Sequence, residues 1–93
     1  MITVHAVFHS HFRELAATAR DSFQLDQPLV AELAERISAK YGAKMKAMLI
    51  DPETNDLNER GTMFVDTKGK RISIADKLED GETISFLVGI AGG

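Results

Sequence analysis

The chain contains no cysteine. It therefore has no disulfide framework, thiolate nucleophile, iron–sulfur cluster or cysteine zinc site, so any sulfur chemistry must use another group. It also lacks an apolar run of bilayer length and a basic, apolar leader, since residues 1–4 enter a strand-like pattern at once. These absences predict a cytoplasmic protein with no membrane partner.

Acidic residues are in small excess, with 14 Asp and Glu against 11 Lys and Arg. The formal net charge is −3, and the 11 Lys and Arg residues are scattered along the chain. Nucleic acid binding needs a clustered basic face, so we predict none. The 44% apolar and 27% charged fractions of the 93 residues are typical of one globular domain, which we assign to 1–93.

Three elements have clear periodicity. Alternating apolar residues predict a first strand over about 2–8 and a last strand over 82–88. An apolar stripe predicts the main helix, with Asp26 as its N-cap and Gly42 as the left-handed residue that closes it. The stripe consists of Val30, Leu33, Ala34, Ile37 and Tyr41.

The remaining segments give weaker signals. Residues 11–21 have poor helical spacing and are predicted as a loop with a short turn. The other expected elements are strands over 22–25, 45–50 and 63–65 and turns over 51–56 and 67–70. Together they predict an α+β domain, a mixed sheet of about four to five strands with one main helix.

The sequence ends in two glycines, Gly92 and Gly93, directly after an apolar run that continues the last strand to Ile90. With no side chains, both can lie extended in a channel too narrow for any other residue and present the α-carboxylate to an enzyme. A frayed end is the alternative. The position after a strand favours a functional, flexible tail over about 89–93.

Four separated stretches carry a family pattern. They are Phe8 with His11–Ala16, Leu33–Tyr41, Phe64–Ile72 and Leu78–Gly93. Together they resemble the MoaD/ThiS family of sulfur carriers, whose fold is the ubiquitin-like β-grasp. Many relatives have prolines where this chain has Leu87–Ile90, and an Asn-Gly turn where it has Asp66–Gly69. These departures leave the subfamily open.

The resemblance implies a chemistry for the tail. Attack of the Gly93 carboxylate on the α-phosphate of ATP gives an acyl-adenylate, and sulfur then displaces AMP to leave a thiocarboxylate. The chain is then a protein cosubstrate, not an enzyme, and binds no cofactor. ATP and magnesium belong to a MoaB/ThiF-type adenylating enzyme, since the chain has no phosphate-binding loop. The other implied partners are a sulfurtransferase or other sulfur donor and a synthase large subunit.

The sulfur acceptor is open. The resemblance is closest to the molybdopterin branch, in which the chain would be a synthase small subunit of molybdenum cofactor biosynthesis. Carriers of this shape also serve thiamine, cysteine or tRNA thiolation. Two rival hypotheses remain: a ubiquitin-like modifier joined through Gly93 to target lysines, and a non-catalytic β-grasp binding module whose glycines are only a flexible end.

An activating enzyme has to contact the chain beside the tail. Leu87 is the apolar side chain that strand alternation turns away from the core there. Arg13 lies in the stretch that resembles the family's first loop and is suited to acidic partner groups. Ile90 and Ala91 are suited to the mouth of a close-fitting channel. We expect these four residues to bind the partner.

Two further patterns are given no role. His5, His9 and His11 have the parity of one strand face and could hold zinc. A strand that ends near Phe8 breaks that alignment, so we expect exposed histidines on a sheet edge. The acidic loop over 51–56 lacks the glycine and terminal glutamate of an EF-hand, which favours a solvated loop over a calcium site.

Overall fold

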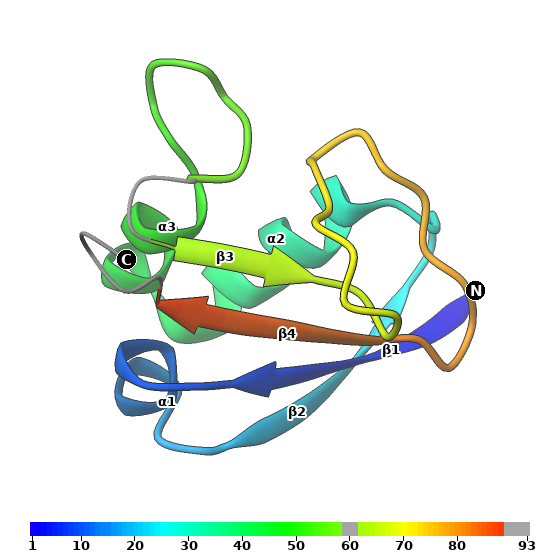
Figure 1. Cartoon of the computed structure of the whole chain (residues 1–93), viewed down its shortest axis with the longest axis horizontal. Helices are drawn as coiled ribbons and strands as arrows, with labels where there is room; N and C mark the ends of the chain where they lie inside the picture. The colour runs from blue at the N-terminus through cyan, green and yellow to red at the C-terminus, as the bar shows by residue number, and fades with distance from the viewer. Residues whose placement is uncertain (59–61, 89–93) are drawn as a thin grey trace.

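The computed structural model describes residues 1–58 and 62–88 of the chain (Figure 1). Over these residues it contains four strands and three helices. Their bounds are β1 Ile2–Phe8, α1 His11–Ala16, β2 Arg20–Leu25, α2 Val30–Tyr41, α3 Ala43–Leu49, β3 Thr62–Val65 and β4 Thr83–Val88. No helix in the described ranges is long and apolar enough to cross a membrane.

The strands form one mixed sheet in the order β2-β1-β4-β3. β1 runs parallel to β4, while β2 is antiparallel to β1 and β3 is antiparallel to β4. Helices α2 and α3 lie behind the sheet in Figure 1, so the sheet has a helix-covered inner face and an outer face. In β1, Val4, Ala6 and Phe8 are buried, and the residues between them are half-buried. This confirms the predicted α+β domain with a mixed sheet and one main helix.

The main helix, α2, packs the predicted apolar stripe onto the inner face. Leu33 and Ile37 are at most 1% exposed. The prediction that Asp26 caps this helix is wrong, because the N-cap is Leu29, which is extended and makes no side-chain cap. Glu32 stabilises the preceding turn instead, because its carboxylate accepts a hydrogen bond from the backbone N–H of Asp26 at 2.5 Å.

The segment after Gly42 is a helix, not the strand predicted over 45–50. Gly42 ends α2 at φ 93° and ψ −171°, which glycine adopts without strain, although this is not the left-handed helical conformation that was predicted. Helix α3 then buries Met45 and Leu49, four residues apart on one side. The prediction failed because a short apolar run suits a buried strand as well as a buried helix, and alanine, lysine, methionine and leucine favour helix.

Three corrections concern the N-terminal half. Residues 11–16, predicted within a loop, form α1, which buries Phe12 and Ala16. Strand β2 begins at Arg20, two residues before the predicted start. Strand β1 is an inner strand, so His5 does not lie on a sheet edge as predicted.

Candidate functional site

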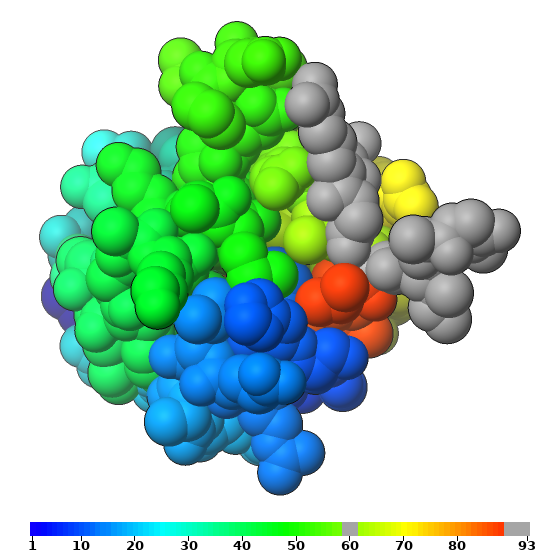
Figure 2. Space-filling view, turned by 90° about the vertical axis from the view of Figure 1, so that its left-hand side faces the viewer, coloured from blue at the N-terminus to red at the C-terminus, as the bar shows by residue number. Residues whose placement is uncertain are grey.

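The candidate site is the C-terminal end of β4, the last described element before the predicted tail. Strand β4 lies between β1 and β3, and the backbone N–H of His9 donates to the Phe86 carbonyl at 3.0 Å. Figure 2 looks onto this end, with α1 in blue next to the red end of β4. Pairing on both edges fixes the direction of the last residues of β4.

A cluster of four phenylalanines anchors this end from the inner face. Phe86 is only 3% exposed. Its ring centroid lies 5.3 Å from that of Phe8 and 5.5 Å from that of Phe64. The ring of Phe12, from α1, is 5.9 Å away. Such aromatic pairs add about 0.5–1.5 kcal/mol each beyond the area they bury, so β4 is held firmly up to Phe86.

The outer face of the same end is apolar and only partly covered. Leu87 is half-buried and lies directly opposite Met63 of β3. Val7 and Val65 are also half-buried, and alternation along β1 and β3 turns them to the same face. We call Val7, Met63, Val65 and Leu87 the outer patch. It is a partly exposed apolar surface beside the end of β4 on which a partner can pack.

Of the other predicted site residues, the structure describes only Arg13. Arg13 is exposed on α1, beside the end of β4, and no ion pair to another described residue holds it. Gly92, Gly93, Ile90 and Ala91 lie outside the described residues. The partner roles of Leu87 and Arg13 and the roles of those four residues stay predictions.

Two surface hollows lie away from this end. One, of about 450 Å³, lies between α2 and α3 and includes Ala34, Lys46 and Ile50. The other, of about 410 Å³, is polar and lies between the turn at 66–68 and residues 77–82, which lead into the start of β4. Neither is lined by a residue of α1 or of the outer patch. The candidate site therefore lies apart from both hollows.

The three histidines do not share one strand face. Strand β1 ends at Phe8, so His9 and His11 follow it in the turn and in α1. The Nδ1 atom of His5 is 2.8 Å from the hydroxyl oxygen of Ser22, on the outer face. In residues 1–58 and 62–88, no three His, Cys, Asp or Glu side chains are grouped so that they could hold a metal ion.

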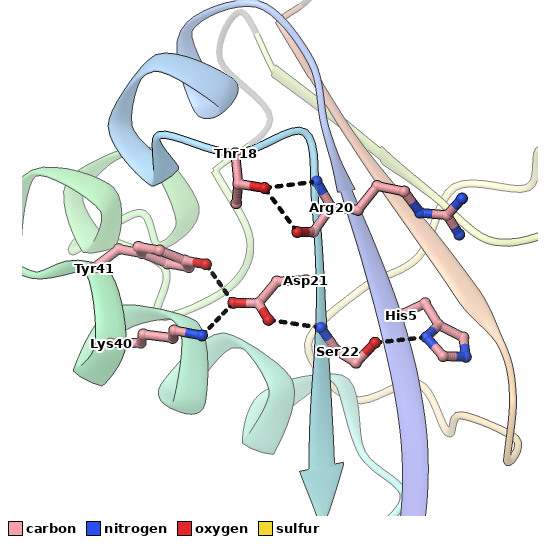
Figure 3. Close-up of polar contacts among 7 residues, drawn as sticks. All are labelled: His5, Thr18, Arg20, Asp21, Ser22, Lys40 and Tyr41. Atoms are coloured by element: carbon pink, nitrogen blue, oxygen red, sulfur yellow. Dashed lines mark hydrogen bonds and ion pairs between the residues drawn. The ribbon is translucent and has the colours of Figure 1, made fainter.

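A polar cluster joins β2 to the end of α2 on the inner side (Figure 3). The Asp21 carboxylate accepts hydrogen bonds from Lys40 Nζ at 2.6 Å, from the Tyr41 hydroxyl and from the Ser22 backbone N–H at 2.8 Å. Burial raises the pKa of Asp21, but these hydrogen bonds together lower it below its ordinary value. Burial and the Asp21 carboxylate both raise the pKa of Tyr41 well above its ordinary value.

The alkaline titration of Tyr41 tests this cluster. It is the only tyrosine, so phenolate absorbance reports it alone. We expect a midpoint above the ordinary value of about 10, and a lower midpoint in the Asp21→Asn variant. Because the folded-state pKa is raised, the stability from this bond is complete below the unfolded pKa and is lost as pH rises through the folded pKa. A wild-type midpoint equal to that of the urea-unfolded chain would contradict the cluster.

Comparisons with known proteins identify the fold. No protein-family model and no curated protein matches the chain. The solved structure of the Haloferax volcanii HVO 2177 protein matches with a TM-score of 0.81 at 20% identity, over 99% of this chain and 87% of that one. A putative molybdopterin converting factor subunit 1 from Pyrococcus furiosus matches at 0.76 and 19%, over 97% and 100%. Small archaeal modifier protein 1 from H. volcanii matches at 0.77 and 8%, over 97% and 100%.

The chain has the β-grasp fold. The resemblance to MoaD/ThiS-like ubiquitin-fold proteins is thus confirmed for the fold, which is what a likeness at 20% identity or less shows. In this β-grasp domain, sequence reasoning singled out Leu87 but not the other members of the outer patch. The signal for Val7 was its place in the alternation of β1, while Met63 and Val65 needed the pairing of β3 with β4.

Proposed function

We propose that this β-grasp domain is a sulfur carrier that works through the carboxylate of Gly93. The observation that carries the proposal is the combination of this fold with a sequence that runs from its inner strand β4 to Gly92-Gly93. The absence of cysteine is consistent with it, because the sulfur then resides on the carboxyl carbon and not on a side chain. The proposal requires Gly93 to be the last residue of the mature chain.

The chemistry needs two displacements. A carboxylate oxygen of Gly93 attacks the α-phosphate of ATP, and pyrophosphate leaves. Hydrosulfide delivered by the donor then attacks the acyl carbon and AMP leaves, so that Gly93 becomes a thiocarboxylate with no change of oxidation state. ATP and magnesium are bound by a ThiF-type adenylating enzyme, and a sulfurtransferase or another donor supplies the sulfur. This chain supplies the acyl group and a surface for its partners, and is a cosubstrate.

For the acceptor we propose the molybdopterin precursor, with a synthase large subunit as the further partner. The resemblance of the loop and terminal stretches to that branch supports this choice, as does the structural likeness to a putative molybdopterin converting factor subunit.

A modifier joined to target lysines through Gly93 is the second candidate. The likeness to small archaeal modifier protein 1 favours it, since that protein has the same fold over nearly its whole length. Both candidates use the same activated acyl group and differ only in whether sulfur or an amine accepts it.

The test is the intact mass of the chain, recovered with a free C-terminus from cells that contain its own activating enzyme. An oxygen-to-sulfur mass shift localised to Gly93 supports the carrier. Gly93 joined to lysines of other proteins, without that shift, supports the modifier. An unmodified chain beside an active enzyme overturns both and leaves the binding module.

The substitution Leu87→Asp tests the partner surface. We expect the dissociation constant for the activating enzyme to rise at least about tenfold, because a charge replaces an apolar contact. The melting temperature should change little, since Leu87 lies on the outer face. The matched control is Gln24→Asp, because Gln24 is an exposed residue of β2 on the same face, far from the end of β4. Binding equal to wild type, or loss of folding, would contradict the assignment.

A further inference from the structure

Strand β2 forms one edge of the sheet, so only one of its two sides is paired. It comes first in the order β2-β1-β4-β3 and pairs with β1 alone, over its six residues Arg20–Leu25. An edge strand presents a row of backbone N–H and C=O groups to which a strand of another chain can add. What these groups bind in the monomer therefore decides whether the edge is open.

The register identifies which backbone groups of β2 face the free edge. The N–H of Phe8 donates to the Ala19 carbonyl at 2.8 Å, which makes these two residues a hydrogen-bonded pair of the ladder. Pairs alternate along an antiparallel ladder, so every second residue of β2 from position 20 turns its N–H and C=O away from β1. On β1, the N–H of His5 accordingly points away from β2 and donates to the Glu82 carbonyl at 2.9 Å. The outward residues of β2 are Arg20, Ser22 and Gln24.

Side chains of this chain already occupy most of the outward groups. The Thr18 hydroxyl accepts the N–H of Arg20 at 3.4 Å and donates to the Arg20 carbonyl at 3.0 Å. The Asp21 carboxylate accepts the N–H of Ser22 at 2.8 Å, and Figure 3 shows it on the opposite side of β2 from β1. Among the residues that the structure describes, no side chain accepts the N–H of Gln24. The edge is therefore closed at two of its three outward residues.

Helix α2 holds the Asp21 carboxylate in this position. The carboxylate also accepts hydrogen bonds from Lys40 Nζ at 2.6 Å and from the Tyr41 hydroxyl, both at the end of α2 (Figure 3). Hydrogen bonds to an ionised group are among the strong ones, and each of these restricts the rotation of the side chain. The Ser22 N–H is thus blocked by a group that is itself anchored.

We propose that the free edge of β2 is a latent pairing surface for a second copy of this chain, held closed in the monomer by the Asp21 carboxylate and the Thr18 hydroxyl. Antiparallel pairing about a two-fold axis at Ser22 puts Arg20 of one copy opposite Gln24 of the other. All outward residues then pair, and no two like charges face each other. This self-complementarity favours a second copy over an unrelated strand. The inference is independent of the chemistry at Gly93.

Sedimentation equilibrium of variants that open the edge tests the proposal. We expect the double variant Thr18→Val/Asp21→Ala to dimerise with a dissociation constant at least about tenfold lower than that of the wild type, because two N–H groups become free to pair. Asp21→Asn is the matched control. It makes the same change in net charge but keeps an oxygen that can accept the Ser22 N–H, so it should behave like the wild type.

Addition of Gln24→Pro to the double variant distinguishes strand pairing from unspecific association. Proline removes an outward N–H without breaking a ladder bond to β1, so the dimer should be lost while circular dichroism shows a folded chain. A dimer that survives this change overturns the inference. So does a double variant that is as monomeric as the wild type, or an Asp21→Asn variant that dimerises as strongly as the double variant.

Amide hydrogen exchange tests the closed edge in the wild-type chain, where no variant has to fold. Ser22 and Gln24 lie on the same edge and differ in whether a side chain accepts their N–H. We expect the protection factor of the Ser22 amide to be at least about tenfold that of the Gln24 amide. Equal protection of the two amides would show that the carboxylate does not close the edge, and would also overturn the inference.

Discussion

Extension of the chain by a few residues beyond Gly93 is expected to abolish adenylation by the activating enzyme. The reacting group is then no longer a free α-carboxylate on glycine. The new terminus is displaced from the reaction centre, and the added side chains do not enter a channel wide enough for glycine alone. Displacement of a reacting atom by even 1 Å can cost about a hundredfold in rate, so displacement by whole residues should leave no exchange above background.

The matched control is an extension of the same length before Met1. Met1 is 83% exposed and lies at the opposite end of the molecule from the end of β4 (Figure 1). That variant should be adenylated like wild type. Both variants should have the melting temperature of the wild type, since neither alters the described core. If the C-terminal extension is still thiocarboxylated or conjugated, Gly93 is not the reacting residue, and the proposal that the chain works through the Gly93 carboxylate fails. An unaltered partner affinity in that variant would favour the binding module.

The parts of the fold that sequence predicted are those with a long local period. Strand β1, helix α2 and strand β4 each repeat their apolar positions often enough to identify both the element and its buried face. Helix α1 has only six residues, too few to be stable or recognisable alone, and it exists because Phe12 packs against Phe64 and Phe86.

The parts that sequence missed depend on contacts between distant residues. The start of β2 was missed because Asp21 occupies an inward position that the strand pattern expects to be apolar. It is tolerated there because Lys40 and Tyr41, about twenty residues later, donate to its carboxylate.

The substitution Phe86→Ala is expected to have the largest effect on stability. Phe86 is 3% exposed and contacts the three other rings of the aromatic cluster. Truncation of such a residue costs about 3–5 kcal/mol, through lost burial and the cavity that remains. A chain of 93 residues has a total stability of roughly 5–14 kcal/mol, so the variant should be close to unfolding at moderate temperature.

Urea unfolding followed by far-ultraviolet circular dichroism measures the change. Phe86→Leu should cost less, about 1–2 kcal/mol, because it keeps the apolar volume and loses mainly the ring contacts. Ser85→Ala, one residue earlier on the outer face, should remain within about 0.5 kcal/mol of wild type. Equal losses for Phe86→Ala and Ser85→Ala would place the core on the wrong side of β4. Because Phe86 is buried on the inner face and leaves the outer patch unchanged, adenylation of the Phe86→Leu variant should decline in proportion to its folded fraction and no further.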